Sequence, residues 1–98
     1  DLLIKMSSGF GEAQAADKKI RGLTNEVKLR VEKALGLSFA EFDAIKYRVQ
    51  NTAEGANYKI KVQVGGRKYV HIQIFVPAKK GKIQLLEQAG NKNLEDAL

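Results

Sequence analysis

The sequence has no cysteine, no tryptophan, one proline and one histidine among its 98 residues. Without cysteine the chain can form no disulfide and no thiolate metal cluster, so its fold must rely on packing alone. The single histidine, His71, excludes a multi-histidine zinc site and is the only residue around which a Ser-His-Asp site could be built. No serine, cysteine or carboxylate alternates beside it in the sequence. We therefore expect no catalytic residue, no metal and no cofactor, and a protein that is not an enzyme.

The chain also lacks a long apolar run. No stretch approaches the roughly 20 apolar residues of a membrane span, and the apolar residues 2–4 are too few for a signal peptide. We expect a soluble protein with no membrane partner and with one domain over residues 1–98, because a second domain would need a longer chain. The absence of cysteine fits the cytoplasm, and a secreted chain that has lost its signal peptide would fit as well.

Apolar residues at helical spacing predict one amphipathic helix over residues 17–35. Asp17 can cap its first turn, and Gly36 suits the left-handed position that ends many helices. Residues 6–16 show no periodicity, and we expect a flexible segment that is poorly ordered up to about Gln14. The apolar stripe of the helix consists of Ile20, Leu23, Val27, Val31 and Leu35.

After Gly36 the apolar residues alternate with polar ones, as is typical of half-buried strands. Three alternating runs and a fourth apolar run indicate an antiparallel meander. Pro77 ends the third run, because proline donates no hydrogen bond to a neighbouring strand. We predict an α+β fold with one long N-terminal helix packed across a four-stranded antiparallel sheet. The predicted strands are residues 45–49, 58–64, 70–76 and 83–88, and a turn follows at residues 90–93.

The turn between the second and third strands can be assigned from side-chain parity, because directly paired residues point to the same face of a sheet. A two-residue turn at Gly65-Gly66 would pair apolar Ile60 with polar His71. A three-residue loop over residues 65–67 pairs Ile60 with Ile72 instead, which predicts an odd loop or a bulge here. The same register pairs Val62 with Val70 and Tyr58 with Ile74.

Positive charge is in excess, with 17 Lys+Arg against 11 Asp+Glu and a net charge of +6. This excess favours acidic partners but is too small for a dedicated nucleic-acid-binding arm. Sheets that bind RNA expose several aromatic residues for stacking, whereas Phe75 is the only aromatic clearly in the polar phase of the central strands. A solvated cationic face opposite the helix is therefore the favoured interpretation, and polyanion binding is the alternative. This face is predicted to contain or border Lys59, Lys61, Gln63, Arg67, Lys68, His71 and Gln73.

Three places in the sequence resemble one family. They are Met6-Ser7-Ser8-Gly9 before the helix, Gln50-Asn51-Thr52-Ala53-Glu54-Gly55 between the first two strands, and Val76-Pro77 after the third. The runs Gly55-Ala56-Asn57-Tyr58-Lys59-Ile60-Lys61-Val62 and His71-Ile72-Gln73-Ile74-Phe75 are the most specific. From Met6 to Leu98 the chain resembles the stefins, the disulfide-free, single-domain branch of the cystatin superfamily.

The resemblance implies a cystatin-like fold and reversible, tight inhibition of papain-like cysteine proteases of the cathepsin type. In stefins the N-terminal segment and two hairpins form a wedge that blocks the protease cleft without a covalent bond. Glycine at position 9 would let the N-terminal segment bend into that cleft. The implied protease-binding residues are Ser7, Ser8, Gly9, Phe10, Gln50, Asn51, Thr52, Ala53, Glu54, Gly55, Val76 and Pro77.

The sequence departs from the stefin pattern at both hairpins. The Q-x-V-x-G motif has no central valine here, and Glu54 makes the first hairpin one residue longer and more polar, so weaker or shifted inhibition is expected. The second hairpin is shortened after Phe75, and residues 1–5 precede the expected initiator Met6 as a non-native remnant or an extension. A non-inhibitory binding module, natural or engineered, is therefore an alternative function. A domain-swapped dimer could form if the first hairpin, residues 49–56, opened.

Overall fold

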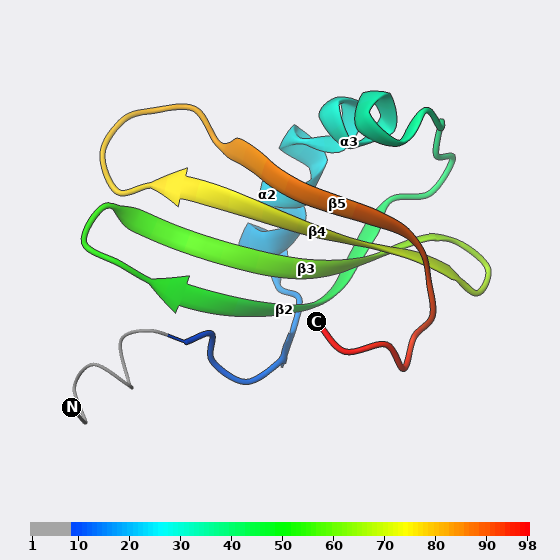
Figure 1. The fold of residues 1–98 in the computed structure, drawn as a ribbon, viewed down its shortest axis with the longest axis horizontal. Coiled ribbons are helices and arrows are strands. Elements are labelled where there is room, and N and C mark those ends of the chain that lie inside the picture. The colour runs from blue at the N-terminus through cyan, green and yellow to red at the C-terminus, as the bar shows by residue number, and fades with distance from the viewer. Residues whose placement is uncertain (1–8) are drawn as a thin grey trace.

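The computed structural model describes residues 9–98, and in it two helices lie on one face of a five-stranded antiparallel sheet (Figure 1). The strands are hydrogen-bonded in the order β1-β2-β3-β4-β5, so neighbours in the sequence are neighbours in the sheet. Their bounds are β1 (Gln14–Ala15), α2 (Lys18–Glu26), α3 (Lys28–Leu35), β2 (Asp43–Asn51), β3 (Gly55–Gly65), β4 (Lys68–Pro77) and β5 (Gln84–Lys92). The predicted α+β meander is thus confirmed, but two of its details are wrong.

The first correction concerns the helix, which is not one continuous element. It is interrupted at Val27, whose φ of −101° and ψ of 3° are not helical and whose N–H bonds to the carbonyl of Thr24 at 3.2 Å. Buried Thr24 gives the physical reason, because its hydroxyl donates to the carbonyl of Ile20 at 2.8 Å, and threonine bonding of this kind bends helices. Both predicted ends are confirmed: Asp17 accepts from the N–H of Ile20 at 2.9 Å, and Gly36 has a left-handed φ of 70°.

The second correction concerns the sheet, which has five strands and not four. The additional strand is β1, in which Gln14 pairs with Tyr47 and Ala15 pairs with Lys46. The N–H of Gly11 also bonds to the carbonyl of Val49 at 2.9 Å. The expected lack of order up to about Gln14 is therefore wrong from Gly11 onward. A strand of two residues is too short to show an alternating pattern in the sequence.

The register predicted for β3 and β4 is confirmed, with a bulge between Gln63 and Gly65. In the register, Val62 pairs with Val70, Ile60 with Ile72 and Tyr58 with Ile74. These side chains face the helices and form the core together with Ile20, Val27, Val31 and Ile83, all of which are buried.

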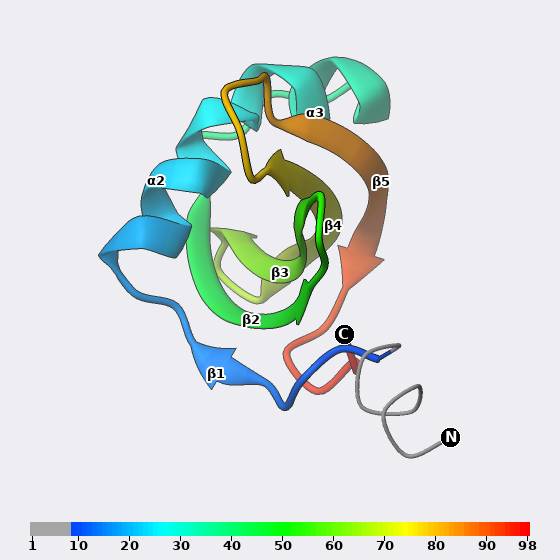
Figure 2. The same ribbon diagram turned by 90° about the vertical axis from the view of Figure 1, so that its left-hand side faces the viewer.

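Strand β5 is longer than predicted and includes most of the residues expected to form a turn. The pairing of β5 with β4 contains two register irregularities, and Asn91 has a left-handed φ of 56°. Extra residues in one strand bend a sheet, so the Gly90-Asn91 pair that resembles a turn in the sequence lies within a bent strand. Figure 2 shows the curvature of the sheet, with the helices on one side and both ends of the described chain on the other. Among residues 9–98, no helix is long and apolar enough to cross a membrane.

Candidate functional site

The two connections implied as protease-binding hairpins lie at the same end of the sheet. Figure 1 shows the β2–β3 hairpin and the β4–β5 connection side by side, and the β3–β4 turn lies at the opposite end. Gly55 pairs with Pro77 and Ala56 with Val76, so the first residues of β3, which follow the first hairpin, lie beside the last residues of β4. We call this end of the sheet, residues 51–55 and 76–82, the loop edge.

The first hairpin is closed by Thr52 and Gly55. The N–H of Thr52 donates to the carbonyl of Gly55 at 2.7 Å, and the N–H of Gly55 donates to the carbonyl of Thr52 at 3.3 Å. The Thr52 hydroxyl also donates to the carbonyl of Gly55 at 3.0 Å. Below this turn, the Asn57 amide donates to the side-chain oxygen of Gln50 at 3.1 Å. Ala53 and Glu54 are therefore displayed at an ordered tip and are exposed to solvent.

Gly55 lets the first hairpin approach β4 more closely than any other residue would. A Cβ at this position would lie 2.2 Å from the carbonyl oxygen of Val76 and 2.9 Å from the Cα of Pro77. The carbonyl of Glu54 also accepts a hydrogen bond from the N–H of Ala78 at 2.8 Å. The two hairpins are thus joined through their backbones, and the loop edge is one structural unit.

The second connection folds back on its proline. Val76 and Pro77 are half-buried, whereas residues 78–82 are exposed. Gly81 lies against the Pro77 ring, since a Cβ on this glycine would be 3.1 Å from Cγ of the proline. At the far end of the connection, Arg30 of α3 donates to the carbonyl of buried Ile83. The connection is therefore held at both of its ends.

The described part of the N-terminal segment is held by Arg48 of β2, which the sequence analysis did not identify. The Arg48 guanidinium donates through Nε to the carbonyl of Gly11 at 2.7 Å and through Nη2 to the carbonyl of Phe10 at 3.2 Å. Its Nη1 donates to the carbonyl of Leu98 at 2.9 Å. The ammonium of Lys59 lies 4.6 Å from the centre of the Phe10 ring, within the range of a cation–π contact.

Gly9 is exposed, and a Cβ at this position would have no described residue within 4 Å apart from its chain neighbour. Ser7 and Ser8, the other two implied residues of the segment, lie outside the described residues. The alternating pattern places Arg48 on the outer face of β2, but it contains no signal that two chain segments converge there.

The predicted solvated cationic face is wrong for Lys61, whose side chain is only 2% exposed. Its ammonium donates to the carbonyls of Asn93, Leu94 and Asp96, the last at 2.7 Å. Burial lowers the pKa of Lys61, and the positive charge of Lys46 lowers it further. The carboxylate of Asp96 acts in the opposite direction, but the pKa remains below its ordinary value. The C-terminal segment therefore covers part of the face that was expected to be open to solvent.

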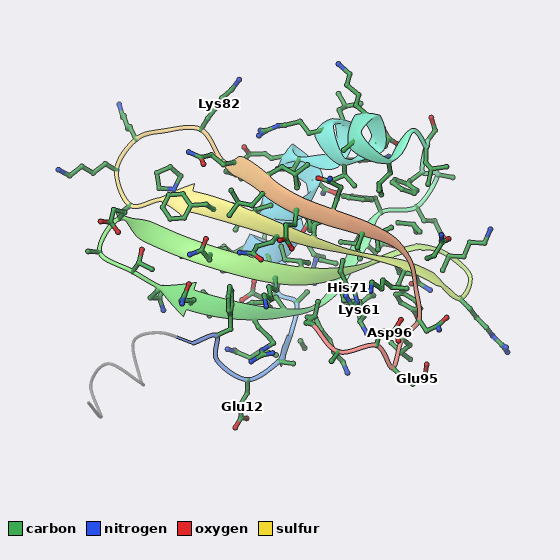
Figure 3. All side chains as sticks on the ribbon, in the orientation of Figure 1. Glu12, Lys61, His71, Lys82, Glu95 and Asp96 are labelled. Carbon is green, nitrogen blue, oxygen red and sulfur yellow. The ribbon has the colours of Figure 1, made fainter. Side chains whose placement is uncertain are left out.

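His71 lies on the sheet surface opposite the helices, as predicted, and is half-buried. Figure 3 shows it close to Lys61, with Asp96 nearby. Its Nε2 atom is buried without a hydrogen-bond partner among the described residues. Burial lowers the pKa of His71, and the positive charges of Lys61 and Lys92 lower it further. The charge of Asp96 raises this pKa, but the net shift is downward. Among residues 9–98, no group of three His, Asp or Glu side chains could hold a metal ion.

Comparison with known proteins gives no match to a family model. Individual relatives do match over almost the whole chain. Leukocyte cysteine proteinase inhibitor 1 of Sus scrofa is 36% identical over 95 residues, which are 95% of this chain and 91% of that protein. Cystatin-A of Felis catus is 36% identical over 92% of this chain and 93% of its own length.

Stefin-C of Bos taurus is likewise 36% identical, over 92% of this chain and 90% of that protein. None of these three names denotes an enzyme. Identity at this level along nearly the full length, in a chain without cysteine, supports the resemblance found in the sequence motifs. The chain belongs to the stefin family of the cystatins.

Proposed function

We propose that this chain is a reversible, tight-binding inhibitor of papain-like cysteine proteases of the cathepsin type. The relative in Sus scrofa is named a cysteine proteinase inhibitor, which supports this function. The single observation that carries the proposal is the close contact of Gly55 with Val76 and Pro77, since it makes the two hairpins one wedge. The inhibitor needs no catalytic group, because it acts by filling the cleft and excluding substrate.

The loop edge is suited to binding with little loss of conformational entropy. Thr52 and Gly55 close the first hairpin with backbone and side-chain hydrogen bonds before any partner arrives. The second connection presents Val76 and the rigid ring of Pro77. Because ordering flexible side chains and loops opposes association, a preformed edge of this kind retains more of its contact energy as affinity.

The N-terminal segment provides the third contact of the proposed wedge. Phe10 is held by Arg48 and Lys59, and exposed Gly9 marks the point from which residues 7 and 8 would extend along the cleft. The proposed binding site consists of Ser7, Ser8, Gly9, Phe10, Gln50, Asn51, Thr52, Ala53, Glu54, Gly55, Val76 and Pro77. The wedge would pass the protease cysteine without placing a peptide bond in position for cleavage. It would therefore block the cleft without forming a bond to that cysteine.

The test is titration of papain and of a cathepsin with the protein, followed by assay with a fluorogenic peptide. Loss of activity that saturates with added inhibitor and is recovered on dilution is expected. A Gly9→Trp variant should keep its fold, because no described residue other than its chain neighbour comes within 4 Å of the new Cβ, and it should inhibit less. Full protease activity at micromolar protein would contradict the proposal.

A non-inhibitory binding module is the second candidate, and the exposed Glu54 at the hairpin tip favours it, because a carboxylate loses its solvation when it enters an apolar cleft. Polyanion binding is less favoured, because Lys61 is covered by the C-terminal segment. Salt-dependent retention on heparin tests that alternative directly.

We also propose that residues 1–98 act as one domain and that the protein is cytoplasmic, in agreement with its lack of cysteine. Opening of residues 49–56 would produce a domain-swapped dimer, and the hydrogen bonds of Thr52 oppose this opening. Size-exclusion chromatography after mild heating tests this expectation, since a dominant dimer would contradict it.

A further inference from the structure

The β4–β5 connection carries a concentrated positive charge beside the proposed wedge. Lys79, Lys80 and Lys82 lie within four consecutive residues, and all three are exposed. Figure 3 shows Lys82 extending from this connection into solvent. Within residues 9–98 no carboxylate forms an ion pair with any of them. The only acidic residue of the loop edge is Glu54, at the tip of the first hairpin.

These charges have a fixed place relative to the hairpins. The connection begins at Ala78, which bonds to the carbonyl of Glu54, and turns back where Gly81 lies against Pro77. The lysines therefore sit next to the part of the wedge that would enter the cleft, on its β4–β5 side. A bound protease would meet them with the surface that borders its cleft, and not with the active-site floor.

We propose that the lysine loop, residues 79–82, directs this inhibitor to papain-like proteases whose cleft is bordered by Asp and Glu side chains on the side that receives the β4–β5 connection. This inference rests on the proposed function and specifies its partner. Complementary charge at the rim of an interface acts mainly by accelerating association, and the acceleration is lost at high salt.

The test compares two variants with the same change in net charge. K79E/K80E/K82E reverses the lysine loop, whereas the control K18E/K33E/K68E reverses three exposed lysines outside the loop edge. All six side chains are exposed, so both variants should keep the fold. The probes are a cathepsin with an acidic cleft rim and a variant of that enzyme in which the rim carboxylates are replaced by Asn and Gln.

Stopped-flow inhibition should show that K79E/K80E/K82E associates with the acidic enzyme about 10- to 100-fold more slowly than the control at low salt. The difference should shrink as salt is raised and should nearly vanish with the neutralised enzyme. Equal association rates for the two variants on the acidic enzyme would overturn the inference while leaving inhibition itself established. Failure of the unchanged protein to inhibit either enzyme would instead overturn the proposed function, and the inference with it.

Discussion

Replacement of Gly55 by alanine tests the idea that the two hairpins form one wedge. The new Cβ would lie 2.2 Å from the carbonyl oxygen of Val76, whereas real Cβ atoms essentially never come within 3.0 Å of an atom to which they are not covalently linked. Both close backbone neighbours, in Val76 and Pro77, belong to β4, so relief requires the first hairpin to move away from that strand. Overpacking of this kind costs about 1–3 kcal/mol. For a domain of this size, 2 kcal/mol corresponds to a fall of roughly 8–16 °C in Tm.

The Gly55→Ala variant should therefore melt roughly 10 °C below the unchanged protein and inhibit papain at least about tenfold more weakly, since 1.4 kcal/mol of lost contact energy is tenfold in affinity. The matched control is Gly66→Ala, at the opposite end of the sheet. Gly66 has a φ of 55°, and among the described residues only its own chain neighbours come within 4 Å of its would-be Cβ, so alanine there adds about 1–2 kcal/mol of backbone strain without a clash. Differential scanning fluorimetry and inhibition assays measure both effects. Unchanged melting and inhibition in Gly55→Ala would refute the reasoning.

Arg48→Ala should release the N-terminal segment, because two charge-assisted hydrogen bonds to that segment are lost. The dissociation rate of the protease complex, measured by surface plasmon resonance, should then rise about tenfold. An unchanged rate would show that Arg48 does not position the segment. Lys61→Met should increase hydrogen exchange at residues 93–96, because it removes the ammonium that bonds to their carbonyls. Lys46→Met, which changes an exposed lysine, is the control. Equal protection of residues 93–96 in the two variants would contradict the role of Lys61. The lowered pKa of His71 means that the unfolded chain binds a proton more readily, so unfolding free energy should decrease as pH falls below about 6.5. His71→Gln should weaken that dependence in urea titrations at several pH values, and an identical pH profile would assign it to other groups.

Much of the fold follows from local patterns in the sequence. Parity alone selects the register of β3 on β4, because only one loop length places Ile60 opposite Ile72. The cap residues Asp17 and Gly36 were also identifiable, since capping depends on the few residues around a helix end. Such features need no knowledge of the tertiary structure.

The features that escaped prediction depend on contacts between distant parts of the chain. Periodicity shows that Lys61 faces away from the helices, but not that the C-terminal segment lies over it. The break at Val27 depends on a buried hydroxyl, which a hydropathy pattern treats as a minor irregularity. In the candidate site, motif resemblance indicated the hairpins but gave no information about Arg48, which holds the N-terminal segment through backbone carbonyls.

The way in which Lys61 holds the C-terminal segment has a consequence for sequence variation. All three of its acceptors are main-chain oxygens, which are present whatever side chains occupy residues 93, 94 and 96. Asp96 has a separate side-chain role, because its carboxylate accepts the N–H of Asn93 at 2.8 Å and closes the turn. Leu94, by contrast, is 46% exposed and supplies the anchor only with its carbonyl. Position 94 is therefore a place where new recognition side chains can be displayed on the outer face of the sheet without removing the ammonium that secures the segment.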